Sequence, residues 1–104
     1  MYLVVNKNEY FLPLDLVQTD FLPSVDVKIV QSGSMEPAIP TGSLVLVKAE
    51  ERYQTDDVIT FTTRGVSDVP TTHRVVRDAL QAGDLVYYTK GDANNDIDPE
   101  PARP

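Results

Sequence analysis

The chain contains no cysteine and only one histidine among its 104 residues. Without cysteine it can form no disulfide, no thiolate metal site and no cysteine nucleophile. A single histidine also excludes a metal centre built from several imidazole ligands. These two scarcities therefore exclude thiol chemistry and any metal centre built from thiolates or from several imidazoles.

Basic residues and long apolar runs are also scarce. Nine lysines and arginines stand against 16 aspartates and glutamates, giving a formal net charge of −7. This balance argues against a nucleic acid partner, because phosphate binding needs clustered positive charge. The best apolar runs, residues 2–5 and 44–47, are far shorter than the roughly 20 residues of a membrane span. The N-terminus also lacks the features of a signal peptide, so the chain as given is expected to be soluble.

Signals for helix are weak, whereas signals for strand recur. Eight prolines are spread through the chain, and no long stretch has helical periodicity. Short β-rich runs alternate instead with turn-forming residues. This pattern predicts a mainly β fold with little helix, in the form of a compact, strongly bent antiparallel sheet or partial barrel. The expected strands are residues 2–5, 25–30, 43–48, 58–62, 73–77 and 85–89.

The length predicts one domain. Residues 1–24 mix polar with large apolar side chains and are interrupted by two prolines. We interpret them as an N-terminal extension that packs on a core formed by residues 25–104. Residues 85–88 (LVYY) are apolar throughout, which indicates a strand buried on both faces.

The segment with the most chemical potential is residues 31–40 (QSGSMEPAIP), called the serine turn below. A glycine between two serines lets the backbone turn sharply, so that a hydroxyl can project from the end of a strand. A rigid turn suits a nucleophile, because a fixed attacking oxygen loses less entropy on reaction. A Ser-Gly-Ser turn is nevertheless common in proteins and does not identify a nucleophile by itself.

Three further segments change that assessment. Residues 32–42 (SGSMEPAIPTG), 57–61 (DVITF), 72–76 (THRVV) and 89–99 (TKGDANNDIDP) closely resemble, in this order, the sequence blocks of the type I signal peptidases. The resemblance implies that Ser34 is a catalytic nucleophile and that the chain carries the catalytic domain of such an enzyme. It also implies chemistry that needs neither a metal nor a cofactor. Asp56 stands where the family usually has glycine.

The resemblance also assigns the general base. Common bacterial members pair the serine with lysine, whereas the archaeal and endoplasmic-reticulum branch has histidine at the aligned position. This chain has His73 there, so it resembles the second branch. Histidine, with an unperturbed pKa of about 6.5, can take a proton from serine and return it to the leaving amine near neutral pH.

The remaining roles follow from the same resemblance. The backbone N–H of Ser34 and the hydroxyl of Ser32 are expected to bind the oxyanion, although Ser32 could instead cap the turn. In the histidine-using branch the triad carboxylate lies six residues after the aspartate that follows glycine. That position is Asp98 here, so Asp98 is expected to orient His73. Asp92 is expected to brace the loop, and Asp96 falls outside the pattern.

Residues 91–98, called the acidic loop below, allow a second interpretation. Their alternating oxygen side chains are similar to the opening of a calcium-binding loop. Such a loop needs glycine at its sixth position and glutamate at its twelfth. Ile97 and Arg103 occupy those positions, which disfavours calcium.

The family resemblance implies a serine endopeptidase that removes signal peptides from secreted preproteins by cleavage after small residues in an Ala-x-Ala-like pattern. It implies a membrane-anchored protein whose catalytic domain lies on the extracytoplasmic or lumenal side. We expect that anchor to be absent from this chain. Family domains usually continue beyond the acidic block, so residues 25–104 are expected to lack the C-terminal strands.

Two other interpretations remain open. Self-cleaving repressors share the serine motif and a related β fold but use lysine as base, and none of Lys7, Lys28, Lys48 and Lys90 lies in the block that holds His73. A catalytically silent β module that binds an extended peptide would share every structural signal. A hydrogen bond between Ser34 and His73, with Asp98 behind the imidazole, would favour the peptidase.

Overall fold

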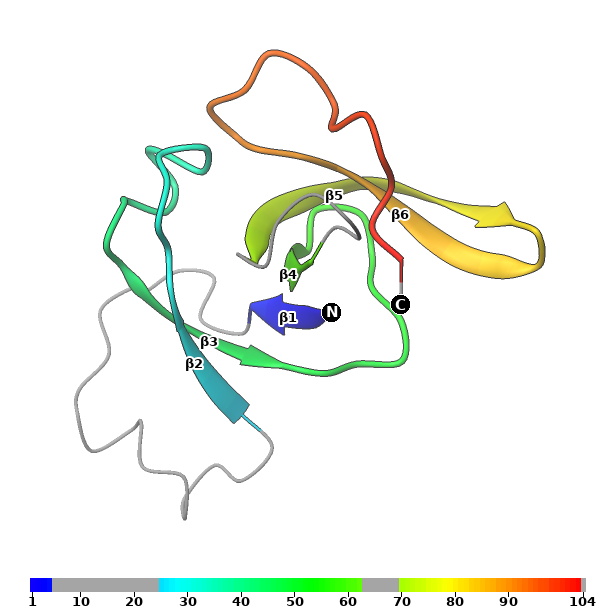
Figure 1. Ribbon diagram of the computed structural model, residues 1–104, viewed down its shortest axis with the longest axis horizontal. Coiled ribbons are helices and arrows are strands. Elements are labelled where there is room, and N and C mark those ends of the chain that lie inside the picture. The colour runs from blue at the N-terminus through cyan, green and yellow to red at the C-terminus, as the bar shows by residue number, and fades with distance from the viewer. Residues whose placement is uncertain (5–24, 63–69, 104) are drawn as a thin grey trace.

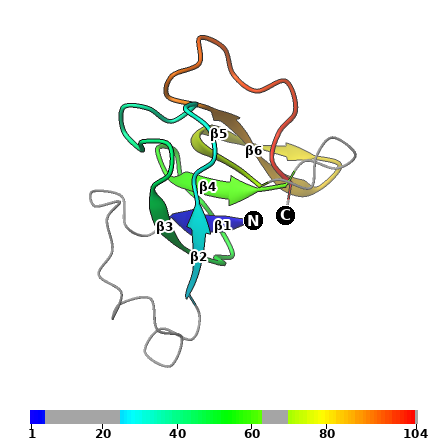
Figure 2. The ribbon, with the colours of Figure 1, turned by 60° about the vertical axis from the view of Figure 1, so that its left-hand side comes forward.

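The computed structural model describes residues 1–4, 25–62 and 70–103. This part of the chain forms one antiparallel sheet and contains no helix. The strand order is β2-β3-β1-β4-β5-β6, and Figures 1 and 2 show the sheet curling around its short central strands. The predicted mainly β fold is confirmed. The strands are β1 (Tyr2–Val4), β2 (Val25–Ile29), β3 (Leu44–Lys48), β4 (Val58–Phe61), β5 (Thr71–Gln81) and β6 (Asp84–Lys90).

The observed strands follow the predicted ones closely, with one exception. β5 extends to Gln81, well beyond the predicted end at residue 77, because its second half pairs with β6 in a hairpin. The hairpin turn has positive φ at Ala82 (51°) and at Gly83 (86°). Of the expected N-terminal extension, residues 1–4 are described and residues 5–24 lie outside the described part. The described residues include no helix that is long and apolar enough to cross a membrane.

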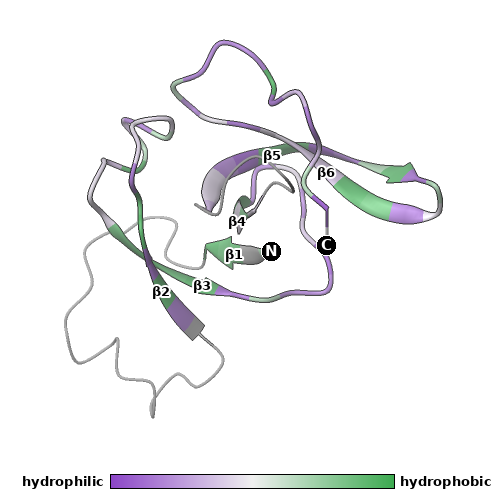
Figure 3. Ribbon diagram, viewed as in Figure 1, coloured by the Kyte–Doolittle hydropathy of each residue, from purple (hydrophilic) through white to green (hydrophobic). Residues whose placement is uncertain are grey.

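The apolar core lies in two clusters, and neighbouring residues of one strand often belong to different clusters. Val58 packs in the first cluster and Ile59 in the second, so β4 is buried at all four positions. Figure 3 shows most of the hydrophobic colour on strands, while the acidic loop is largely hydrophilic. The first cluster consists of Val4, Val30, Met35, Ile39, Val45, Val47 and Val58; the second consists of Tyr53, Ile59, Phe61, Val75, Tyr87 and Ala102.

The chain returns along β6 after the acidic loop (Figure 1). Val86 and Tyr87 are both buried although they point to opposite faces, as predicted for this strand. Tyr87 exchanges two backbone hydrogen bonds with Ala102, at 2.9 and 2.7 Å. This bridge holds the segment that follows the acidic loop beside the sheet and so limits where Asp98 can lie.

Candidate active site

The serine turn is anchored to the sheet by two of its own apolar side chains. Met35 and Ile39 are fully buried in the first cluster, and the N–H of Ile39 donates to the carbonyl of Met35 at 2.8 Å. Ser34 precedes Met35 directly and is half-buried. Burial of the next residue therefore fixes the backbone from which the hydroxyl of Ser34 projects.

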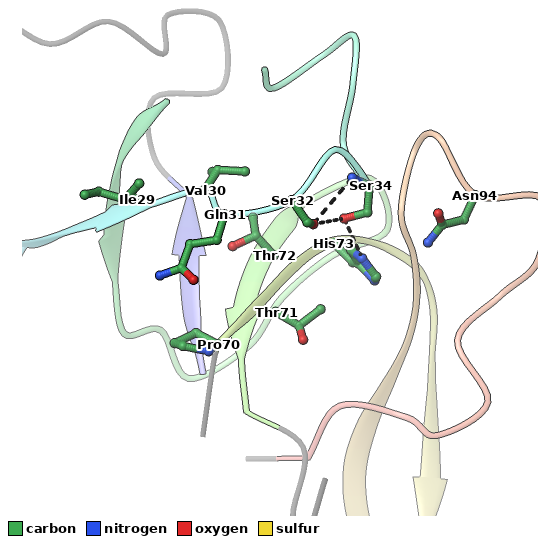
Figure 4. Close-up of a pocket in the computed structure, with 10 residues that line it drawn as sticks. All are labelled: Ile29, Val30, Gln31, Ser32, Ser34, Pro70, Thr71, Thr72, His73 and Asn94. Carbon is green, nitrogen blue, oxygen red and sulfur yellow. Dashed lines mark hydrogen bonds between the residues drawn. The ribbon is translucent and has the colours of Figure 1, made fainter. Parts of the chain in front are cut away.

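His73 lies opposite this hydroxyl, on β5. It pairs with Ile59 of β4, and the residue is buried, at 7% exposure. The distance from His73 Nε2 to Ser34 Oγ is 3.0 Å, and Figure 4 marks this contact with a dashed line. The structure thus brings the predicted nucleophile and the predicted base into hydrogen-bond contact.

Asp98 lies behind the imidazole. Its Oδ2 atom is 2.6 Å from His73 Nδ1. Because a carboxylate only accepts hydrogen bonds, Nδ1 carries the proton, and the lone pair of Nε2 faces Ser34 when the ring is neutral. Ser34, His73 and Asp98 therefore form one continuous hydrogen-bonded chain with the polarity that proton removal from serine requires.

Ser32 lies beside the nucleophile. Its Oγ atom is 3.1 Å from Ser34 Oγ and 3.5 Å from the backbone nitrogen of Ser34. Figure 4 shows both hydroxyls close together at the same edge of the pocket. The hydroxyl of Ser32 is exposed and free to rotate, so it can donate to an oxygen that develops negative charge next to Ser34.

Asp92 faces a different partner. Arg74 Nε and Nη2 donate to its two carboxylate oxygens at 2.9 and 2.8 Å, and Arg74 Nη1 donates to the carbonyl of Asp56 at 3.0 Å. The guanidinium of Arg74 holds the pKa of Asp92 below its usual value, mainly through these hydrogen bonds. Asp92 thus ties the acidic loop to the strand that carries His73.

The acidic loop also contacts the serine turn directly through its backbone. The N–H of Ala93 donates to the carbonyl of Ser34 at 2.8 Å, and the N–H of Asp92 donates to Met35 Sδ at 3.4 Å. Gly91, the first residue of the acidic loop, is buried against the serine turn. A Cβ atom at this position would lie 2.7 Å from the Ser34 carbonyl oxygen and 3.0 Å from His73 Nε2, so the close approach requires glycine.

The hydroxyls open into a cleft of about 390 Å³. It runs between the end of β2 and the beginning of β5, with Asn94 of the acidic loop at one side (Figure 4). An extended peptide could lie along this cleft with a carbonyl carbon at Ser34. Its lining consists of Ile29, Val30, Gln31, Ser32, Ser34, Pro70, Thr71, Thr72, His73 and Asn94.

The lysines in the described ranges bind elsewhere. Each has a carboxylate or carbonyl partner: Lys28 with Asp26, Lys48 with Glu50 and Lys90 with Gly91. Lys7 lies outside those ranges. The position next to the Ser34 hydroxyl is therefore held by the imidazole, which disfavours the lysine-based interpretation.

The carboxylates of the acidic loop do not converge on one point. Asp92 binds Arg74, Asp98 binds His73, and Asp96 is exposed. Within residues 1–4, 25–62 and 70–103, no three candidate ligand side chains are grouped closely enough to hold a metal ion.

Three residues that contribute to the site were not assigned a role from the sequence. Arg74 binds Asp92, Thr89 binds Asp98, and Gly91 leaves space for the Ser34 carbonyl. All three lie inside the sequence blocks that resemble the family. Their contacts depend on strand pairing and on the path of the acidic loop. The sequence blocks therefore include these residues but do not predict which partners they contact.

Comparison with known proteins gives similar relatives in bacteria and eukaryotes. Signal peptidase I W of Bacillus subtilis (strain 168) is 45% identical over 78 residues, which cover 72% of this chain and 40% of the relative. The signal peptidase complex catalytic subunit SEC11C of Homo sapiens is 36% identical over 75 residues, covering 69% and 38%. The subunit SEC11 of Metarhizium robertsii is 38% identical over 72 residues, covering 66% and 41%.

The chain spans about two fifths of the length of these curated relatives. No protein-family model matches it, and no solved structure gives a significant match. The similarity to signal peptidases nevertheless extends over about 70% of the chain. The chain therefore belongs to the type I signal peptidase family.

Proposed function

We propose that this chain is a serine endopeptidase that removes N-terminal signal peptides from secreted preproteins, cleaving after small residues in an Ala-x-Ala-like pattern. The observation that carries the proposal is the hydrogen-bonded chain from Ser34 through His73 to Asp98 at the edge of a cleft. The names of its relatives support the substrate class.

In the acylation step, the peptide lies extended in the cleft with its scissile carbonyl at Ser34. The Oγ atom attacks the carbonyl carbon, and His73 Nε2 takes the hydroxyl proton. The resulting oxyanion accepts hydrogen bonds from the Ser34 N–H and the Ser32 hydroxyl. His73 then gives its proton to the leaving nitrogen, so the mature protein departs with a free amine and the signal peptide stays as an ester on Ser34.

In the deacylation step, water replaces the amine. His73 removes a proton from the water as its oxygen attacks the ester, and returns that proton to Ser34 Oγ as the ester bond breaks. Asp98 stabilises the imidazolium that forms twice in this cycle and keeps the Nδ1 proton in place. Asp92 serves as a brace between the acidic loop and β5.

The base also supports a branch within the family. His73 is at hydrogen-bond distance from Ser34, which favours the histidine-using branch of archaeal and endoplasmic-reticulum enzymes. In this proposal the domain works at a membrane, on the extracytoplasmic or lumenal side. Its partners are signal-peptide-bearing preproteins, and the net charge of −7 disfavours nucleic acid.

The proposal is tested by cleavage of a preprotein or of a peptide that spans a signal-peptide cleavage site. Ser34→Ala and His73→Ala should each reduce kcat/KM by at least about a thousandfold. Ser43→Ala is the matched control, since its hydroxyl donates to the carbonyl of Pro40, and it should cleave normally. Full cleavage by either site variant would refute the mechanism, and a wild-type chain that binds the peptide without cleaving it would indicate a silent binding module.

A further inference from the structure

Thr89 of β6 carries a buried hydroxyl that the peptidase mechanism does not use directly. Its side chain is fully buried. The hydroxyl donates to Asp98 Oδ2 at 2.7 Å, and the same oxygen lies 2.6 Å from His73 Nδ1. One carboxylate oxygen thus accepts from both neighbours.

The backbone of Thr89 contacts the same aspartate. Its carbonyl accepts a hydrogen bond from the N–H of Asp98 at 2.8 Å. Thr89 therefore holds Asp98 at two points, through its main chain and through its side chain. Together these contacts define both the position of the residue and the orientation of its carboxylate.

The orientation needs such a partner because Asp98 is not enclosed. Its side chain is 20% exposed, and the residues on either side, Ile97 and Pro99, are exposed as well. A carboxylate in this position could turn toward water, where it finds equally good donors. Thr89 does not have the same freedom, since a β-branched side chain in a strand has restricted χ1 rotation.

Strand pairing places this hydroxyl beside the imidazole. Thr89 pairs with Val75 of β5, two residues after His73 on the same strand. Side chains two apart on a strand point to the same face. The hydroxyl donor and the imidazole are therefore held by one rigid pair of strands, while Asp98 reaches them from a loop.

We propose that Thr89 is a positioning residue of the triad, whose hydroxyl holds the Asp98 carboxylate in the orientation that binds His73 Nδ1. The inference rests on the proposed peptidase function. Thr89 does not line the cleft and touches no reacting atom. Its effect passes through Asp98 to the orientation and tautomer of the imidazole.

The test compares Thr89→Val, which keeps the shape but removes the hydroxyl, with Thr89→Ser, which keeps the hydroxyl. The valine variant should lose about tenfold to a hundredfold in kcat with little change in KM, the loss expected for one hydrogen bond to a charged group. The serine variant should recover most of the rate. Thr60→Val is the matched control, because it removes another buried threonine hydroxyl, the partner of Thr72, and should retain most of kcat.

A second readout does not depend on catalysis. His73 is the only histidine, so its imidazole nitrogen and Nδ1–H signals can be assigned in NMR spectra without ambiguity. These signals should shift or broaden in Thr89→Val and stay near their wild-type positions in Thr89→Ser and Thr60→Val. If the valine variant fails to fold, Thr89→Ala removes the hydroxyl without adding a methyl group against the carboxylate, and the same results are expected.

Two results would overturn the inference: unchanged kcat and unchanged imidazole signals in the valine variant, or an equal loss in the serine variant. The second result would assign Thr89 to packing alone. Failure of the proposed function has a different signature, namely no cleavage by the wild-type chain. In that case the NMR comparison still decides whether Thr89 orients the His73–Asp98 pair.

Discussion

The two segments that meet at the site, the serine turn and the acidic loop, are held by different forces. The serine turn is anchored by Met35 and Ile39, which are fully buried in an apolar cluster. The acidic loop is anchored by polar contacts, chiefly Arg74 on Asp92 and Thr89 on Asp98. One segment therefore depends on burial of apolar surface, and the other depends on hydrogen bonds and charge.

This difference predicts two kinds of failure. Apolar burial is non-directional and roughly proportional to the area removed from water, so its loss lowers stability. A hydrogen bond contributes less net free energy but fixes the orientation of its partners, so its loss disturbs the geometry of the site. Where one partner is a carboxylate, the stability that the hydrogen bond contributes also depends on pH. Loss of an apolar anchor in the serine turn should thus act mainly on folding. Changes in the acidic loop should act on the geometry of the catalytic residues or, where a charge is removed, on the pH dependence of stability.

The largest expected effect comes from Met35→Ala. Removing this fully buried side chain should lower the free energy of unfolding by about 2–5 kcal/mol, measured by urea denaturation. Met35→Leu is the control, since a volume-conserving change usually costs less than about 1.5 kcal/mol although it also removes the sulfur that accepts from Asp92. A similar loss in both variants would show that the sulfur contact, and not burial, anchors the turn.

Gly91→Ala should have the next largest effect, on catalysis. The added Cβ atom would meet the Ser34 carbonyl oxygen at 2.7 Å, so the acidic loop has to move away from the serine turn. A displacement of this kind should lower kcat on the order of a hundredfold. Gly33→Ala should lose far less, because the nearest atoms there are 3.5 Å away. Wild-type kcat in Gly91→Ala would mean that the two segments move independently.

Asp92→Asn should remove a contribution to the free energy of unfolding that varies with pH. Because Arg74 lowers the folded-state pKa of Asp92, the ion pair stabilises the protein above the unfolded pKa of about 3.9. That contribution is lost as the pH falls through the folded-state pKa. The expected loss in the variant at neutral pH is about 1 kcal/mol, and it should shrink toward zero in strong acid.

Unfolding free energies measured from neutral pH down to about pH 2 check this prediction. Asp26→Asn is the matched control, since the Asp26 side chain is 65% exposed in its pair with Lys28, and it should cost clearly less than Asp92→Asn at neutral pH. A loss of equal size at every pH would assign the role of Asp92 to packing.

Asp56→Gly should have the smallest effect, with the opposite sign. Asp56 has φ of 76°, in the left-handed region that favours glycine, and the family resemblance of this block also leads us to expect glycine here. The variant should gain at most about 1 kcal/mol of stability, because the relief of strain is partly offset by a more flexible unfolded chain. Thermal unfolding measures the gain, and a clear loss would show that the aspartate side chain stabilises this turn.

The strands could be predicted from sequence because their apolar and β-branched residues recur between turn signals. The second half of β5 could not, since residues 77–81 (RDALQ) have little strand propensity. Pairing with β6 imposes the extended conformation there. Local preference is overridden by a partner strand in this hairpin.

The site divides in the same way. Ser34, His73 and Asp98 were predicted from sequence blocks, and the structure brings them together. Arg74 and Thr89 were not predicted, because the sequence does not show which side chain faces which loop residue. That information appears only once the register of β5 against β6 and the path of the acidic loop are known.

β1 has a consequence for the distance between nucleophile and base. This three-residue strand lies between β3 and β4. It therefore joins the pair β2–β3, which leads into the serine turn, to the strands β4–β6, which include His73. Val4 packs in the first cluster, and Leu3 packs against the second. A slip of β1 by one residue would exchange these two side chains between the clusters. The distance between Ser34 and His73 therefore depends partly on the register of β1, although none of its three residues takes part in the chemistry.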